Sequence, residues 1–116
     1  MSQLKIDRGT TYTRTLTYQR NGVARTLVGA TVRFTVKATE YSTDATDTDA
    51  VVKKNVTTGD ANGIAVITLT PADTATLAPG KYYYDIKVDE NSNGVNVYKV
   101  DEGTIKLDGS PSNRLA

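Results

Sequence analysis

The chain contains no cysteine and no histidine among its 116 residues. Without cysteine there is no disulfide framework, zinc ribbon or thiol nucleophile, and the redox compartment is not indicated. Without histidine, Ser-His-Asp triads, histidine metal sites and the usual general base near neutral pH are excluded. The sequence therefore lacks the groups on which most catalytic sites depend.

An excess of charge is also missing, because 14 basic residues face 13 acidic ones and the formal net charge is +1. Such a balance provides no field to attract nucleic acid or an anionic membrane. Residues 1–8 contain no apolar run, so neither a signal peptide nor a membrane anchor is expected there. We expect a chain that is made soluble and binds neither nucleic acid nor membrane.

Threonine is abundant beside valine, isoleucine and tyrosine, and these residue types favour half-buried pleated strands. The length suits a single domain with one core. Residues 10–19 alternate strictly, with Tyr12, Leu16 and Tyr18 on one face and threonines on the other. Arg14 is the one flaw on the apolar face. Either it lies near the sheet end with its head group in water, or it contacts a partner.

Short turns separate the other strand segments. Asn21-Gly22 predicts a hairpin followed by a strand through Leu27, and Asn91 to Gly94 predicts another hairpin. Lys53 and Lys54 indicate an edge strand, whereas residues 64–69 are nearly all apolar and are expected at the centre of a sheet. A bulge is expected at residues 101–103. The remaining strands are expected at residues 31–38, 51–57, 82–88, 95–100 and 104–107.

The stretch from Thr70 to Tyr84 has the most specific local chemistry. Thr70 and Asp73 are placed to cap a short helical turn that begins at a proline. The pattern Leu77, Pro79, Gly80, Tyr82 then predicts a tyrosine corner, in which a buried ring bonds backbone a few residues upstream through its hydroxyl. These four residues are interpreted as structural.

Residues 39–50 are polar and acidic without a period, which predicts a long loop. Asp44, Asp47 and Asp49 offer hard oxygen ligands suited to calcium, but their spacing matches no EF-hand. A solvated or partner-facing loop is the favoured interpretation, and no metal or cofactor is expected.

The sequence offers weak candidates for catalysis and for carbohydrate binding. Glu40, Glu90 and Glu102 supply carboxylates, but a small all-β domain offers no obvious cleft to hold two of them, so no enzyme is expected. Tyr83 should be exposed if Tyr82 and Tyr84 are buried, and one exposed aromatic residue is a weak carbohydrate signal. Tyr41 and Tyr98 are further candidates for such a surface.

These features together predict an all-β fold, an immunoglobulin-like antiparallel β-sandwich of about 7–8 strands with one short helical turn near residues 71–77. Residues 1–8 are expected to form an arm or first strand, residues 9–107 the sandwich, and residues 108–116 an extended tail.

Several segments in this order resemble the small immunoglobulin-like domains of tailed-bacteriophage virion proteins, such as the N-terminal domain of baseplate upper proteins and small phage accessory proteins. The segments are residues 8–10, 21–22, 27–34, 63–73, 77–86 and 102–105. The resemblance implies an assembly role in a virion without enzymatic activity. The place on the particle remains open between tail or baseplate, neck and capsid decoration.

We therefore expect a structural virion protein that contacts other virion proteins and symmetry-related copies of itself through its arm, long loop and tail. Candidate contact residues are Tyr41, Tyr83, Arg114 and Leu115. The alternative is an adhesion module that binds a host-surface glycan or receptor.

Overall fold

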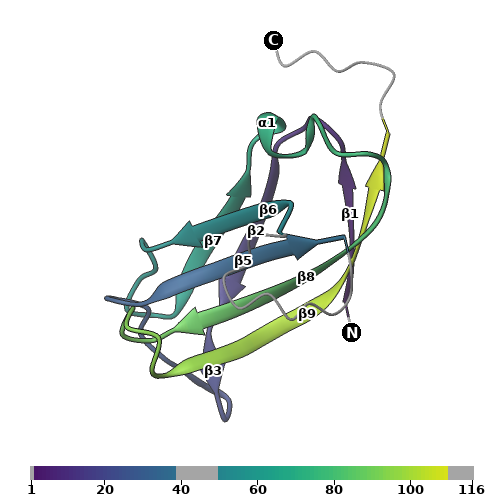
Figure 1. Cartoon of the computed structure of the whole chain (residues 1–116). Coiled ribbons are helices and arrows are strands. Elements are labelled where there is room, and N and C mark those ends of the chain that lie inside the picture. The colour runs from purple at the N-terminus through teal and green to yellow at the C-terminus, as the bar shows by residue number, and fades with distance from the viewer. Residues whose placement is uncertain (1, 39–49, 110–116) are drawn as a thin grey trace.

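The computed structural model describes residues 2–38 and 50–109, and almost all of the regular structure in this part is β-strand (Figure 1). The expected all-β class is confirmed. The elements are β1 (Ser2–Asp7), β2 (Tyr12–Thr17), β3 (Gln19–Arg20), β4 (Val23–Ala24), β5 (Thr31–Lys37), β6 (Val52–Val56), β7 (Ile64–Leu69), α1 (Pro71–Thr74), β8 (Gly80–Asp89) and β9 (Val97–Asp108).

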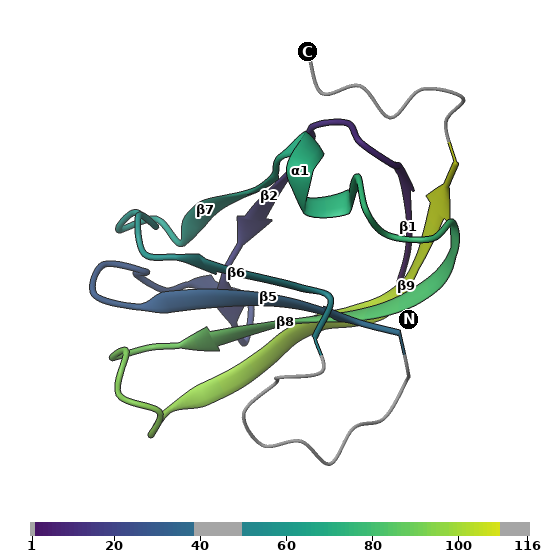
Figure 2. The ribbon, with the colours of Figure 1, turned by 45° about the horizontal axis from the view of Figure 1, so that its top comes forward.

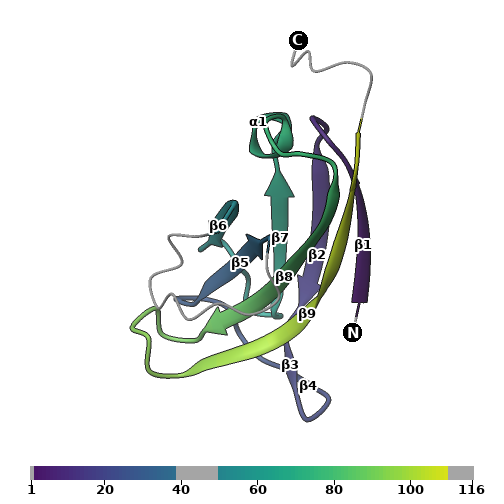
Figure 3. The ribbon, with the colours of Figure 1, turned by 45° about the vertical axis from the view of Figure 1, so that its right-hand side comes forward.

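The strands form a five-stranded sheet in the order β1-β9-β8-β5-β6, a β2–β7 pair and a small β3–β4 hairpin. The β2–β7 pair lies over one face of the five-stranded sheet (Figures 2 and 3). The core lies between these two layers, and its largest fully buried apolar side chains are Tyr18, Phe34, Leu27, Ile67, Leu69 and Ile86. Helix α1 lies at the end where β1 crosses to β2 (Figure 1).

Strand β1 runs parallel to β9, so the expected purely antiparallel arrangement is wrong at this edge. The chain leaves β1 through a turn that leads directly into the other layer, at β2 (Figure 2). Strand β1 therefore needs no hairpin partner and fills the edge beside β9 in the parallel direction.

The first residues are an integral part of this sheet. Ile6 is 2% exposed, Leu4 packs against the core, and the Arg8 amide donates to the Asp108 carbonyl at 2.9 Å. Of the two expected forms, arm or first strand, this segment is a strand. The predicted boundary at residue 108 is one residue early, because Asp108 still pairs with Asp7 in β9; residues 110–116 lie outside the described part.

Strand β7 is not central, which corrects the interpretation of its apolar run. It pairs only with β2 among the described strands, and its burial alternates residue by residue. Ile64 and Val66 are 40% and 47% exposed. The error has a physical cause: isoleucine and valine suit a strand whether or not a neighbour covers them, so the run did not show which face was open.

The predicted hairpin turn at Asn21-Gly22 is confirmed. Asn21 and Gly22 have φ values of 54° and 77°, as a two-residue hairpin turn requires. Strand β4 ends at Ala24 rather than Leu27, whose amide instead donates to the Asp60 carbonyl at 2.9 Å.

A bulge interrupts the β8–β9 ladder, close to its expected place. Ile86 is opposite Asp101 while Lys87 is opposite Lys99, so Val100 is the extra residue. Strand β9 nevertheless continues on both sides of the bulge as one strand. Strand β6, which carries Lys53 and Lys54, lies at the sheet edge as expected.

Candidate functional site

The Asp73 side chain holds the corner after β7 in place. The Asp73 carboxylate accepts hydrogen bonds from the Thr70 amide at 2.7 Å and the Thr70 hydroxyl at 3.1 Å, and it also pairs with the Lys54 ammonium at 2.9 Å. Burial opposes ionisation of this carboxyl, but the hydrogen bonds from Lys54 and Thr70 outweigh that effect, so the pKa of Asp73 lies below its ordinary value. The cap thus also ties the helix to the edge strand β6.

The tyrosine ring at the start of β8 is buried, and its hydroxyl bonds the backbone. The Tyr82 hydroxyl donates to the Ala78 carbonyl at 2.6 Å, which is the upstream contact that the sequence pattern predicts. Gly80 provides the turn with a φ of 148°, and the Thr74 hydroxyl accepts the Gly9 amide at 2.9 Å. The corner therefore joins β8, α1 and the turn after β1.

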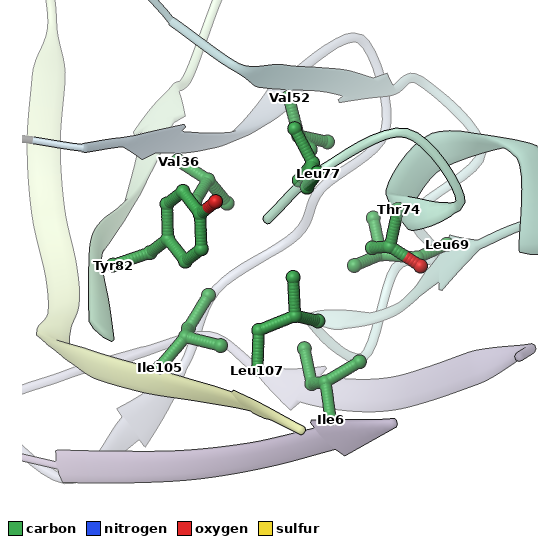
Figure 4. Close-up of a pocket in the computed structure, with 9 residues that line it drawn as sticks. All are labelled: Ile6, Val36, Val52, Leu69, Thr74, Leu77, Tyr82, Ile105 and Leu107. Carbon is green, nitrogen blue, oxygen red and sulfur yellow. The ribbon is translucent and has the colours of Figure 1, made fainter. Parts of the chain in front are cut away.

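A small cavity lies beneath this corner (Figure 4). Its volume is about 10 Å³, which is roughly the least space that a single water occupies. The only polar side-chain oxygens among its labelled residues belong to Thr74 and Tyr82, and both are bonded elsewhere. The lining residues are Ile6, Val36, Val52, Leu69, Thr74, Leu77, Tyr82, Ile105 and Leu107. The geometry is that of a core and not of a ligand site.

A polar cluster connects the two layers at their middle. Arg14 on β2 donates to the Tyr84 hydroxyl at 3.2 Å and pairs with the Asp101 carboxylate, and the Tyr84 hydroxyl donates to the same carboxylate at 2.9 Å. Burial disfavours the charged guanidinium, yet hydrogen bonds with Tyr84 and Asp101 hold the pKa of Arg14 above its ordinary value. Burial also raises the pKa of the nearby Tyr12 hydroxyl.

The first sequence interpretation of Arg14 is therefore wrong, because its head group is bonded to Tyr84 and Asp101 between the layers and does not extend into water at a sheet end. Contact of Arg14 with a partner stays a prediction. The bulge at Val100 places Asp101 opposite Ile86, on the inward face of β9. Two inward-facing charges on opposite layers then meet. A bulge was expected here, but the sequence did not indicate which of its side chains would turn inward.

Two of the three glutamates that could serve in catalysis are bonded to neighbouring side chains, and the third, Glu40, lies outside the described residues. Glu90 accepts the Tyr18 hydroxyl at 2.7 Å and the Arg25 guanidinium at 3.0 Å, and burial together with the bond to Glu90 raises the pKa of Tyr18. Glu102 pairs with Lys99 at 2.8 Å. The structure does not bring the two glutamates together as an acid–base pair.

A larger open groove lies between the β3 end of the sandwich and β9. Its volume is about 420 Å³, and its lining is Leu16, Thr17, Gln19, Arg20, Asn21, Tyr98, Lys99 and Val100. The Arg20 guanidinium lies 3.7 Å from the centre of the Tyr98 ring. Because the cation covers that face of the ring, Tyr98 is not placed to stack a sugar there.

Tyr83 lies on the outer face of the five-stranded sheet, opposite Lys37 and Thr104. Its side chain is half-buried, and the Lys81 ammonium lies 5.3 Å from its ring centre. The other proposed contact and metal residues, Tyr41, Asp44, Asp47, Asp49, Arg114 and Leu115, lie outside the described residues.

Residues 2–38 and 50–109 contain no cluster of three or more acidic side chains that could hold a metal ion. No helix in this part is long and apolar enough to cross a membrane. No known family model matches the chain, and no curated protein is significantly similar to it.

Proposed function

We propose that this chain is a non-enzymatic structural protein of a phage particle, with an immunoglobulin-like sandwich that contacts other virion proteins and copies of itself. The order β9-β8-β5 with β6 beyond it corresponds to the G-F-C-C′ sheet of such a sandwich, and β2–β7 corresponds to its B–E pair. The proposal that this chain belongs to a phage particle rests on its resemblance to phage virion domains.

Two positions support this correspondence further. The tyrosine of the corner stands at the start of the F strand, and in immunoglobulin domains the second cysteine of the inter-sheet disulfide follows it by two residues. Here that place is taken by Tyr84, whose hydroxyl reaches Arg14 on the B strand. Phe34 on the C strand contacts the Tyr84 ring at 5.7 Å between centroids. A hydrogen-bonded cluster thus stands where a disulfide links related sandwiches.

The observation that carries the assembly role is the outer face of the β2–β7 pair. Six residues form it, in the cross-strand pairs Thr13–Thr68, Thr15–Val66 and Thr17–Ile64, and none of them carries a charge. The outer edge of the other sheet is protected by Lys53 and Lys54 on β6, whereas β7 carries no such residue. An uncharged face on a strand pair that has no further strand partner among the described strands suits contact with a neighbouring chain.

Mass spectrometry of purified particles tests the virion role. We expect the chain in particles at a fixed ratio to the other structural proteins. Its absence from particles, together with its recovery as a free protein of the host cell, would overturn the proposal.

A second experiment tests the assembly surface. Val66→Lys puts a charge at the middle of the open face and should lower self-association in sedimentation velocity by about tenfold, since like charges then face each other across the contact. Val95→Lys is the matched control, because Val95 is 74% exposed and lies in a loop away from this face. Equal association of both variants would exclude this face.

A second candidate function is binding of a host-surface glycan. Tyr83 favours it, because this ring lies on the face opposite to the assembly surface, with the Lys81 ammonium 5.3 Å from its centre and Lys37 as its cross-strand neighbour.

A further inference from the structure

The outer face of the five-stranded sheet carries two rows of three directly opposed cations. Lys81 is opposite Lys106, which is opposite Lys5. The second row, six residues further along β8, is Arg33, Lys87 and Lys99. Neighbouring strands lie roughly 4.8 Å apart, so like charges in such rows repel each other and destabilise the sheet. Strand pairing alone does not account for such rows, so something else must offset the repulsion between their cations.

The second row is neutralised within the chain. Arg33 pairs with Asp89 at 3.0 Å, Lys87 approaches Asp85 at 4.0 Å, and Lys99 pairs with Glu102 at 2.8 Å. Each cation in that row has its own carboxylate. The charges of this row are therefore balanced by carboxylates of the same chain.

The row of Lys5, Lys81 and Lys106, which we call the lysine row, is not balanced in this way. Asp108 is the one carboxylate with a described contact to it, at 3.5 Å from Lys5 and 3.8 Å from Lys106. The two lysine side chains are 71% and 64% exposed, and exposed pairs of this kind contribute little to stability. The lysine row therefore keeps a net positive charge that the fold does not use.

Tyr83 lies immediately beside the lysine row. The Lys81 ammonium lies 5.3 Å from its ring centre, and Lys37 is its cross-strand neighbour. Among the residues that the structure describes, no other aromatic residue belongs to this part of the outer face, where Thr104 and Gln3 are the next side chains in line. The surface thus combines an excess of cations, one aromatic ring and neutral hydrogen-bonding groups.

Carboxylates limit the size of the anion that fits. Asp85 and Glu102 face each other on one side of Tyr83, and Asp7 and Asp108 face each other beyond the lysine row. A long polyphosphate such as nucleic acid would extend across these carboxylates. A protein partner would require more apolar area than one tyrosine supplies. A short, hydrated, acidic ligand remains the best match.

We propose that the lysine row and Tyr83 bind a short acidic oligosaccharide, with the lysines on its carboxylate or sulfate groups and a sugar unit beside Tyr83. This inference rests on the second candidate function and not on assembly through the β2–β7 face. The two surfaces lie on opposite sides of the molecule, so a copy held by its β2–β7 face presents the lysine row outward.

Binding measured by calorimetry with defined-length heparin and oligogalacturonate tests the proposal and distinguishes sulfate from carboxylate as the preferred anion. Dextran is the neutral control. We expect saturable binding to at least one acidic saccharide and none to dextran, with an affinity that falls as salt rises. The double variant Lys81→Gln/Lys106→Gln should lose about tenfold in affinity, because two charge contacts are removed.

The matched control is Lys87→Gln/Lys99→Gln, which removes the same charge from the same face but at the neutralised row. It should keep its affinity within about twofold. Equal losses in both double variants, tighter binding to a single-stranded DNA of the same charge, or no binding to either acidic saccharide would each overturn the proposal. Thermal unfolding of every variant verifies that the fold is intact. Particle mass spectrometry is independent of these results, so failure of the virion role is distinguished from failure of this site.

Discussion

Replacing Arg14 by methionine should destabilise the fold by about 2 kcal/mol. Methionine keeps the aliphatic packing of the arginine stem but leaves the Asp101 carboxylate on the inward face without its cation. Removing one partner of a fully buried ion pair costs roughly 3–5 kcal/mol. The side chains of Arg14 and Asp101 are 25% and 17% exposed, so water offsets part of that cost and we take about half of it.

Urea unfolding in a double-mutant cycle measures the pair itself. The cycle combines Arg14→Met with Asp101→Asn, and the coupling energy should be at least about 1 kcal/mol. The same cycle on Lys5 and Asp108, whose side chains are 71% and 28% exposed, should give a coupling energy close to zero. The two pairs differ in burial, which is the variable under test, and Asp101 also accepts a hydrogen bond from Tyr84.

A coupling energy for Arg14 and Asp101 no larger than that of the control pair would refute the reasoning. The Arg14 head group would then be solvated in practice, as one of the two sequence interpretations supposed. A large coupling energy would instead support a link between the two layers. If the variants also keep the wild-type dependence of the unfolding free energy on urea concentration, that link forms only in the folded state.

Two further predictions concern the corner. Tyr82→Phe should cost about 1 kcal/mol in urea unfolding, because a buried hydroxyl loses its bond to a backbone carbonyl; Tyr83→Phe, on the exposed face, is the control, and equal effects would contradict the tyrosine corner. Asp73→Asn should remove stability above the ordinary pKa of 3.8 and change little at lower pH. The sign follows from the lowered pKa: the carboxylate held by Lys54 and Thr70 stabilises the fold when ionised, and this contribution is lost as pH falls through the folded-state pKa. Unfolding free energies of the two proteins that differ equally at pH 7 and at acid pH would contradict this.

The functional surfaces were predicted less well than the elements that support them. Tyr83 was identified from alternation alone, because the burial of Tyr82 and Tyr84 forces it outward. The lysine row was missed, since Lys5, Lys81 and Lys106 are far apart in the sequence and become neighbours only through the register of three strands. A whole-chain charge of +1 concealed this local excess.

The sequence by itself determined the features that depend on a few adjacent residues. The turn at Asn21-Gly22 follows from which residues tolerate a positive φ, and the corner at Tyr82 follows from the proline and glycine before it. The two-residue period likewise placed Leu16 and Tyr18 on one face, and both are buried.

Only the tertiary structure decided which strands are neighbours and in which direction they run. The pairing of Arg14 with Asp101, 87 residues apart, and the parallel course of β1 beside β9 both depend on contacts between distant segments. The exposure of Ile64 and Val66 depends on whether another layer covers them. The local propensity of these residues is the same with or without the neighbouring segment, so it does not indicate pairing, strand direction or exposure. Packing between distant segments decides all three.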